Sequence, residues 1–142
     1  MIPLSLDEVS RLCDGELTRA SGATEITGVV IDSRRVETGD LFVAVGRGAE
    51  FAPQALERGA AGVLIPGGAE AALAALGGAV RERSSARVVA ITGSTGKTST
   101  KDILASLCAP HAKLVAAEGS FNNELGIPLT LCRLEADTEL AL

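Results

Sequence analysis

A strand, a glycine-rich turn and a helix follow one another between residues 88 and 108, and this order constrains the fold more than any other feature of the chain. The apolar run Val88-Val89-Ala90-Ile91 is typical of a strand that is buried on both faces of a parallel sheet. Gly93-Ser94-Thr95-Gly96-Lys97-Thr98 comes one residue later, and a helical pattern then continues to Cys108. Because parallel strands are joined by crossover helices, the segment predicts an α/β fold.

The chemistry of phosphate binding explains why these residue types stand in this order. Glycines let the backbone turn so tightly that successive N–H groups point inward, and the helix N-terminus adds its positive end. Lys97 can reach the β- and γ-phosphates of ATP, and the Thr98 hydroxyl can ligate Mg²⁺, so we predict both as catalytic residues and Thr98 as the metal ligand. The predicted ATP-binding residues are Gly93, Ser94, Thr95, Gly96, Lys97, Thr98 and Ser99.

The loop is shorter than the commonest phosphate-binding pattern. That pattern, G-x-x-x-x-G-K-[ST], requires glycine at position 91, where this chain has Ile91. The difference argues against the commonest nucleotide kinases and GTPases. The alternative interpretation is an ordinary turn from strand to helix in which Lys97 is incidental.

The rest of the chain alternates between strand and helix patterns, as α/β proteins do. Ser5-Leu6-Asp7-Glu8 is a capping box that predicts a short helix after it. Strands are predicted at residues 26–31, 41–45, 62–65, 113–117 and 138–142. Further helices are predicted at residues 53–58, 69–83, 98–108 and 128–134, the third with an apolar face of Ile103, Leu104 and Leu107.

Two features of the middle of the chain bear on its organisation. Gly77-Gly78 is expected to weaken the helix at residues 69–83 by about 1 kcal/mol per glycine. Ser84-Ser85 then interrupts the pattern. We therefore predict a small N-terminal α/β domain at residues 1–84 and the beginning of a phosphate-loop ATPase domain with a parallel sheet at residues 85–142.

Two polar segments are further candidates for ligand binding. Asp32-Ser33-Arg34-Arg35 directly follows a predicted strand, and a serine hydroxyl with arginine forks can bind a phosphorylated ligand. The loop from Phe121 to Pro128 offers the side-chain amides of Asn122 and Asn123 to a polar ligand. From the residues alone, a capped turn is the favoured interpretation of the first segment, and a polar turn before a helix is the favoured interpretation of the second.

Composition excludes several other classes of protein. The 142 residues carry 13 Lys and Arg against 18 Asp and Glu, and this acidic balance with 3 Phe and no Tyr or Trp argues against nucleic-acid binding. Cys13, Cys108 and Cys132 form no metal or disulfide pattern and are predicted as buried, reduced thiols, and His111 as a surface residue. We expect no signal peptide and no membrane insertion, and hence a cytoplasmic protein.

Taken together, the three polar segments resemble the Mur ligases. The resemblance is carried by Asp32-Ser33-Arg34, Gly39-Asp40-Leu41-Phe42-Val43-Ala44, Gly59-Ala60-Ala61, the phosphate loop and Phe121-Asn122-Asn123-Glu124-Leu125-Gly126-Ile127-Pro128-Leu129-Thr130-Leu131. The last stretch is similar to the members that add D-alanyl-D-alanine. The short phosphate loop is also the form that Mur ligases and folylpolyglutamate synthases have.

The resemblance implies an ATP- and Mg²⁺-dependent ligase of peptidoglycan precursor synthesis that joins D-alanyl-D-alanine to UDP-N-acetylmuramoyl-tripeptide through an acyl phosphate. It implies that Ser33 and Arg34 bind the UDP end of that substrate and that Asn122 and Asn123 lie on its muramoyl-peptide side. The family is expected to be monomeric and has three domains, of which this chain resembles only the first and the start of the second. The chain is therefore expected to be an engineered truncation, a proteolytic fragment or a split gene product, and to be inactive alone. The alternatives are a non-catalytic nucleotide- or UDP-sugar-binding module and a different phosphoryl transferase.

Overall fold

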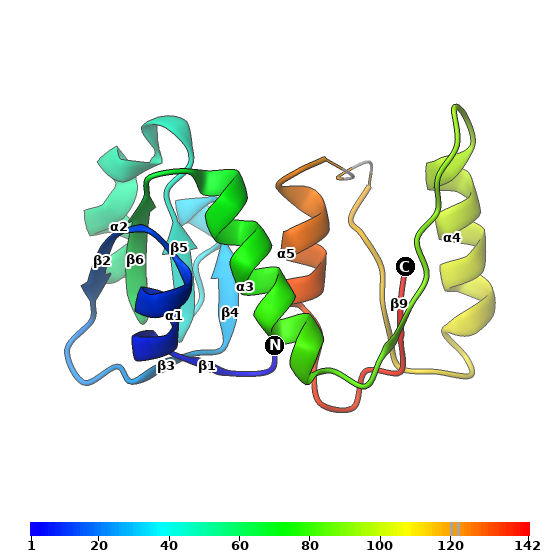
Figure 1. Ribbon diagram of the computed structural model, residues 1–142, viewed down its shortest axis with the longest axis horizontal. Coiled ribbons are helices and arrows are strands. Elements are labelled where there is room, and N and C mark those ends of the chain that lie inside the picture. The colour runs from blue at the N-terminus through cyan, green and yellow to red at the C-terminus, as the bar shows by residue number, and fades with distance from the viewer. Residues whose placement is uncertain (120, 122) are drawn as a thin grey trace.

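The computed structural model describes every residue except 120 and 122 and confirms the α/β class (Figure 1). The first sheet has the strand order β2-β6-β5-β4, in which β4, β5 and β6 are parallel and β2 is antiparallel to β6. Its strands are β2 (Gly15–Arg19), β4 (Gly28–Val30), β5 (Asp40–Val43) and β6 (Gly62–Pro66). A separate antiparallel pair is formed by β1 (Leu4–Ser5) and β3 (Glu25–Ile26).

Three α-helices and two 3₁₀ helices accompany the first sheet. They are α1 (Leu6–Leu12), η1 (Ser33–Arg35), η2 (Gly46–Phe51), α2 (Ala52–Glu57) and α3 (Ala69–Arg83). The predicted cap of α1 is confirmed, since the Ser5 Oγ accepts a hydrogen bond from the Glu8 N–H at 3.2 Å. The Glu8 carboxylate binds Arg83 at the end of α3, so it ties α1 to α3.

The second sheet is parallel and small, with the strand order β7-β9-β8. Its strands are β7 (Arg87–Val88), β8 (Leu114–Val115) and β9 (Leu140–Ala141), and its helices are α4 (Lys97–Cys108) and α5 (Gly126–Cys132). In Figure 1, α5 lies between α3 and β9, and α4 lies beyond β9 on the other side. Strand β7 leads through the glycine loop into α4, as the sequence predicts.

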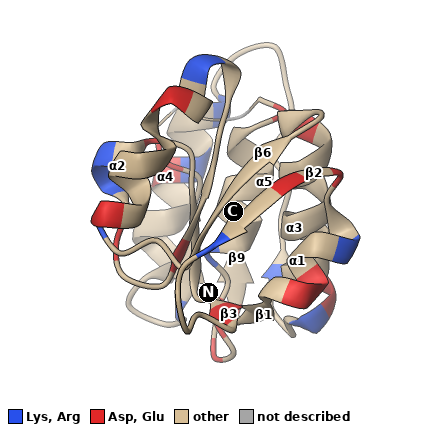
Figure 2. Cartoon of the chain, turned by 90° about the vertical axis from the view of Figure 1, so that its left-hand side faces the viewer, with Lys and Arg blue, Asp and Glu red and all other residues tan. Residues whose placement is uncertain are grey.

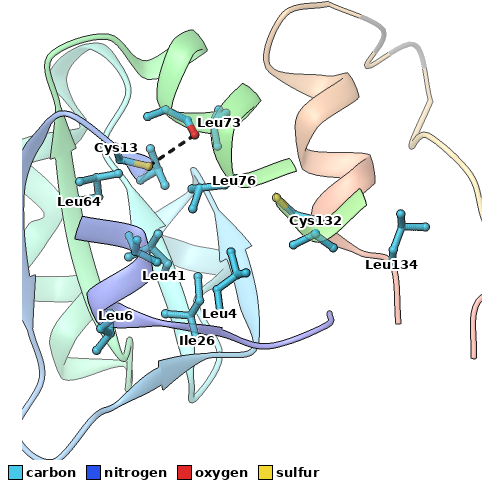
Figure 3. Close-up of a cluster of buried hydrophobic side chains, with 14 of the residues drawn as sticks. Leu4, Leu6, Cys13, Ile26, Leu41, Leu64, Leu73, Leu76, Cys132 and Leu134 are labelled. Carbon is cyan, nitrogen blue, oxygen red and sulfur yellow. Dashed lines mark hydrogen bonds between the residues drawn. The ribbon is translucent and has the colours of Figure 1, made fainter. Parts of the chain in front are cut away.

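Helices α3 and α5 join the two sheets through one hydrophobic cluster (Figure 3). Leu73 and Leu76 of α3 are fully buried in it, together with Cys132 at the end of α5. The closest approach is at Gly77, where an added Cβ would lie 2.9 Å from the Pro128 carbonyl oxygen. Gly77 has a low helix propensity, but its lack of a side chain lets the backbone of α5 pack closely against α3.

Two expectations about burial in the second sheet are wrong. The strand ends at Val88 instead of Ile91, and the Val88 and Val89 side chains are 40% and 36% exposed instead of buried on both faces. On α4, the predicted apolar face leaves Ile103 60% exposed. The reason is that the described residues form only three short parallel strands, so the faces that a wider sheet would bury remain open.

Smaller differences concern element boundaries. The strand expected at residues 26–31 is divided between β3 and β4, which pair with different strands. The edge strand β2 was not predicted, because its sequence Gly-Glu-Leu-Thr-Arg contains a single large apolar residue, and the strand is mostly exposed. The helix predicted at residues 128–134 spans Gly126–Cys132, so it begins two residues before Pro128.

Charged residues of both signs are interspersed over the helices. In Figure 2, both red and blue segments are seen at α1, whose first turn carries Asp7 and Glu8 and whose last turn carries Arg11. This mixture agrees with the net charge of −5, which is the difference between 13 basic and 18 acidic residues. Among the residues that the structure describes, no helix is long and apolar enough to cross a membrane.

The thiols differ in accessibility, and all three are free. Cys13 and Cys132 are buried as predicted, but Cys108 at the end of α4 is only partly buried, which corrects the prediction for that residue. Burial raises the pKa of Cys132 to about 12 and also raises that of Cys13. Both therefore stay protonated and shielded at pH 8, where the thiolate is the reactive form.

A thiol reagent is expected to modify Cys108 in the native protein at pH 8 well before the other two cysteines. A colourimetric disulfide exchange reagent measures this directly, with one rapid thiol in the native chain and three after denaturation. Modification of Cys132 at the rate of Cys108 would contradict the burial described above.

Candidate phosphate-binding site

The glycine loop has the backbone geometry that a phosphate cradle needs. Gly93 and Gly96 have φ angles of +149° and +79°, which only glycine adopts without strain. Helix α4 begins at the next residue, and Gly96 has no side chain that could cap it. The N–H groups of the first turn are therefore available to an anion at the positive end of a twelve-residue helix.

The two predicted catalytic side chains lie on the wall of a cleft. Thr92, Lys97 and Thr98 line a cavity of about 480 Å³, together with residues after β7 and β8 and along α5. The Lys97 Nζ donates a hydrogen bond to the Gly93 carbonyl at 2.6 Å and so spans the loop. An ammonium, a hydroxyl and free helix N–H groups at one cleft fit a nucleotide phosphate with its Mg²⁺.

Thr98 is the residue predicted to bind a metal ion at this cleft. The Thr98 hydroxyl is exposed and lines the cavity. Within residues 1–119, 121 and 123–142, no group of three His, Cys, Asp or Glu side chains lies close enough together to hold a metal ion. Mg²⁺ commonly binds through one or two protein oxygens plus phosphate oxygens and water, so the arrangement fits that cation.

Lys101 is a residue of the site that the sequence reasoning missed. It lies one helical turn after Lys97, lines the same cleft and is only 7% exposed. Its Nζ donates hydrogen bonds to the carbonyl oxygens of Ala117 and Gly119, the second at 3.2 Å, and pairs with Asp102 at 2.9 Å. The i, i+4 spacing from Lys97 was the available signal.

The upstream turn uses its polar side chains within the protein. The Asp32 carboxylate accepts hydrogen bonds from the Arg34 side chain at 2.9 and 2.8 Å and from its backbone N–H at 3.0 Å. Ser33 is buried, and its hydroxyl donates to Gln54 Oε1 at 2.8 Å. Of the two predicted substrate residues, Arg34 is thus exposed to a ligand and Ser33 is bonded to α2.

The Arg34 hydrogen bonds lower the pKa of Asp32 to about 2. Because an unfolded aspartate titrates near 3.9, this carboxylate stabilises the folded turn above about pH 4, and the contribution is lost as the pH falls through about 2. We expect a carboxyl carbon NMR titration of Asp32 to have its midpoint near 2. In Arg34→Gln the midpoint should rise toward 3.9, and an identical midpoint in both proteins would contradict the pairing.

The adjoining Gly39-Asp40 pair is structural. The Asp40 carboxylate accepts a hydrogen bond from the Glu37 N–H at 2.9 Å, and burial raises its pKa. Gly39 has a φ of +93°, and a Cβ on Gly28 would collide with the Asp40 carboxylate. These residues shape the turn that leads into β5.

The downstream asparagine segment is also partly structural. Asn123 Oδ1 accepts a hydrogen bond from the Gly126 N–H at 2.9 Å at the start of α5. The Asn123 residue is exposed and precedes α5, which contributes Ile127, Thr130 and Leu131 to the cleft. Asn122, the other predicted substrate residue in this segment, lies outside the described residues.

Ion pairs bring the upstream turn and the cleft together. Arg35 Nη1 lies 3.4 Å from Glu118 Oε2, and Arg133 Nη1 lies 3.4 Å from the other oxygen of the same carboxylate. Glu118 is flanked by the two residues whose carbonyls Lys101 binds. The upstream turn and the loop after β8 therefore meet at the Arg35–Glu118 pair, although these two residues lie 83 positions apart in the chain.

Comparison with known proteins agrees with this geometry. Residues 91–142, which contain the phosphate loop, α4 and α5, match the model of the Mur ligase middle domain. Over its full length the chain is 32% identical to the UDP-N-acetylmuramoyl-tripeptide–D-alanyl-D-alanine ligase of Escherichia coli strain K12, of which it spans 34%. The chain belongs to the Mur ligase family.

Solved Mur ligase structures share the fold. The structure of MurF from Acinetobacter baumannii superimposes with a TM-score of 0.79 at 28% identity, over 98% of this chain and 35% of that one. The MurF ligase of Thermotoga maritima, solved in complex with ADP, has a TM-score of 0.59 at 30% identity over 80% of this chain and 31% of that one. This Mur ligase chain thus spans about a third of the length of its relatives.

Proposed function

We propose that this chain supplies the UDP-sugar-binding and phosphate-binding parts of an ATP- and Mg²⁺-dependent ligase in peptidoglycan precursor synthesis. The reaction joins D-alanyl-D-alanine to UDP-N-acetylmuramoyl-tripeptide. The cleft at Lys97 and Thr98 carries the proposal, because its ammonium and hydroxyl suit a nucleotide phosphate and the Arg35–Glu118 ion pair brings the upstream turn close to it. The matched relatives named as D-alanyl-D-alanine ligases support it.

The domain division fits this function. We propose that residues 1–84, with the four-stranded sheet, bind the UDP-sugar, and that residues 85–142 begin the ATPase domain. Each predicted part has its own sheet in the structure. The proposed enzyme is monomeric and acts in the cytoplasm, where its nucleotide substrates are made.

The proposed chemistry needs positioning and charge neutralisation more than an enzyme nucleophile. Bound MgATP supplies the phosphoryl group that converts the tripeptide carboxylate into an acyl phosphate. The amine of D-alanyl-D-alanine then forms the amide bond at that carbonyl carbon, and inorganic phosphate leaves. Lys97 leaves the Gly93 carbonyl to bind the β- and γ-phosphates, and Thr98 holds Mg²⁺ through its hydroxyl.

Other residues of the chain bind the acceptor in this proposal. Arg34 is exposed and oriented by Asp32, so its guanidinium is ready for the UDP end. Ser33 is buried, and its hydrogen bond to Gln54 holds the turn that presents Arg34. Asn123 and Asn122 are proposed for the muramoyl-peptide side.

A turnover assay tests the proposal with the protein in the full length that its gene encodes. ADP release from MgATP is measured with both acceptors, and then with either one omitted. Release that requires both UDP-N-acetylmuramoyl-tripeptide and D-alanyl-D-alanine supports the ligase. Nucleotide binding without turnover identifies a binding module, and phosphorylation of a hydroxyl acceptor without an amine identifies another phosphoryl transferase; both contradict it.

A further inference from the structure

We propose that Lys101 is a positioning residue that holds the loop after β8 as one wall of the phosphate cleft. The inference rests on the proposed nucleotide function of that cleft. It assigns Lys101 a role different from that of Lys97, although both lysines lie on the same face of α4 and line the same cavity. Lys97 is free to exchange its single carbonyl partner for a phosphate, whereas Lys101 is committed to the protein.

The burial of Lys101 carries the argument. An ammonium that is 7% exposed loses most of its hydration, which is costly unless its hydrogen bonds are replaced. Here two backbone carbonyls and the Asp102 carboxylate surround the Nζ. An ammonium carries three donor hydrogens, so these three partners account for all of them.

The bound carbonyls lie where ligands of parallel sheets bind. Ala117 and Gly119 follow the end of β8, and the carboxyl ends of parallel strands face the ligand crevice in open α/β sheets. Both residues line the cleft together with Lys101. Ala117 and Gly119 lie 16 and 18 residues after Lys101 in the chain. The lysine therefore fixes a loop that the backbone hydrogen bonds within α4 do not reach.

The same loop extends to the upstream turn. Glu118, between the two bound residues, pairs with Arg35 of η1. By fixing the backbone on either side of Glu118, Lys101 sets the place of the carboxylate relative to the phosphate loop. The lysine therefore connects the position of the nucleotide site to that of the turn proposed to bind the UDP end.

The first test compares Lys101→Met with Lys113→Met. Methionine keeps the apolar stem and removes the donors. Lys113 is the matched control, because its ammonium is likewise held by protein acceptors, the carboxylates of Glu135 at 2.6 Å and Asp137 at 2.7 Å, but it lines no part of this cleft. Without any ligand, NMR amide shifts of residues 117–119 should change in Lys101→Met and not in Lys113→Met.

Nucleotide affinity is the second readout. Lys101→Met should bind MgADP about tenfold more weakly, because the wall of the cleft is no longer held in place before the ligand binds, while Lys113→Met binds as the parent does. Unchanged amides at 117–119 and unchanged affinity in Lys101→Met would overturn the inference, as would equal weakening in both variants. If the parent protein binds no nucleotide, the proposed function fails, and the amide shifts alone decide the role of Lys101.

A measurement on the parent protein avoids any effect of substitution on folding. The ¹⁵N resonance of the Lys101 ammonium should be visible and slow to exchange, since its hydrogens are held by protein acceptors. On addition of inorganic triphosphate with Mg²⁺, the Lys97 signal should shift and that of Lys101 should stay. A Lys101 shift as large as that of Lys97 would show direct phosphate contact and overturn the positioning role.

Discussion

Lys97→Ala is expected to weaken MgATP binding by about ten- to a hundredfold, because one charge-assisted hydrogen bond contributes roughly 1.5–3 kcal/mol. The lysine lies at the first position of α4 and faces the cleft, where it bonds to Gly93 in the absence of a ligand. Isothermal titration calorimetry with MgATP measures the loss.

The fold should survive this substitution. Lys97 is only partly buried and makes one backbone hydrogen bond, so the melting temperature should move by no more than a few degrees. Lys113→Ala is the control for a general change of charge, because it removes a cation far from the loop. Parent-like affinity in Lys97→Ala, or an equal loss in Lys113→Ala, would show that Lys97 does not bind the phosphates.

The second large effect concerns the contact between α3 and α5. Gly77→Ala places a Cβ 2.9 Å from the Pro128 carbonyl oxygen and 3.0 Å from its Cα. These are backbone atoms that move only if the helices separate, so we expect a loss of about 1–3 kcal/mol in the free energy of unfolding. That loss exceeds the helix propensity of roughly 1 kcal/mol that alanine adds over glycine.

The neighbouring glycine is the matched control. At Gly78 an added Cβ meets no atom within 4 Å, so Gly78→Ala should gain about 0.5–1 kcal/mol from propensity alone. Urea denaturation of both variants compares the two free energies of unfolding. The same sign of change in both would mean that α3 and α5 are not in contact as described.

Local signals predicted the parts of the structure that short segments determine. Helix α3 has the predicted bounds, because its alanine and leucine residues persist between a proline-glycine turn and two serines. Ser5 caps α1 and the glycine loop opens α4, since both depend on backbone geometry within a few residues. The candidate phosphate residues therefore came from the sequence directly.

Long-range contacts were outside the reach of that reasoning. The requirement for Gly77 comes from Pro128, which lies fifty-one positions later, and the burial of Lys101 comes from carbonyls beyond β8. Ser33 was selected for a ligand from its residue type, but its hydroxyl is bonded to Gln54 of α2. In each case the partner is remote in the chain, so the local sequence pattern does not predict the contact.

The central claim is that the backbone between Gly93 and Thr98 wraps around a nucleotide's phosphates. An NMR titration of ¹⁵N-labelled protein with MgADP, and separately with Mg²⁺ and inorganic triphosphate, measures it residue by residue. The account predicts that the amides of Gly93 to Ser99 shift most with both ligands. Unmoved loop amides up to the solubility limit of either ligand, or larger shifts elsewhere, would contradict it.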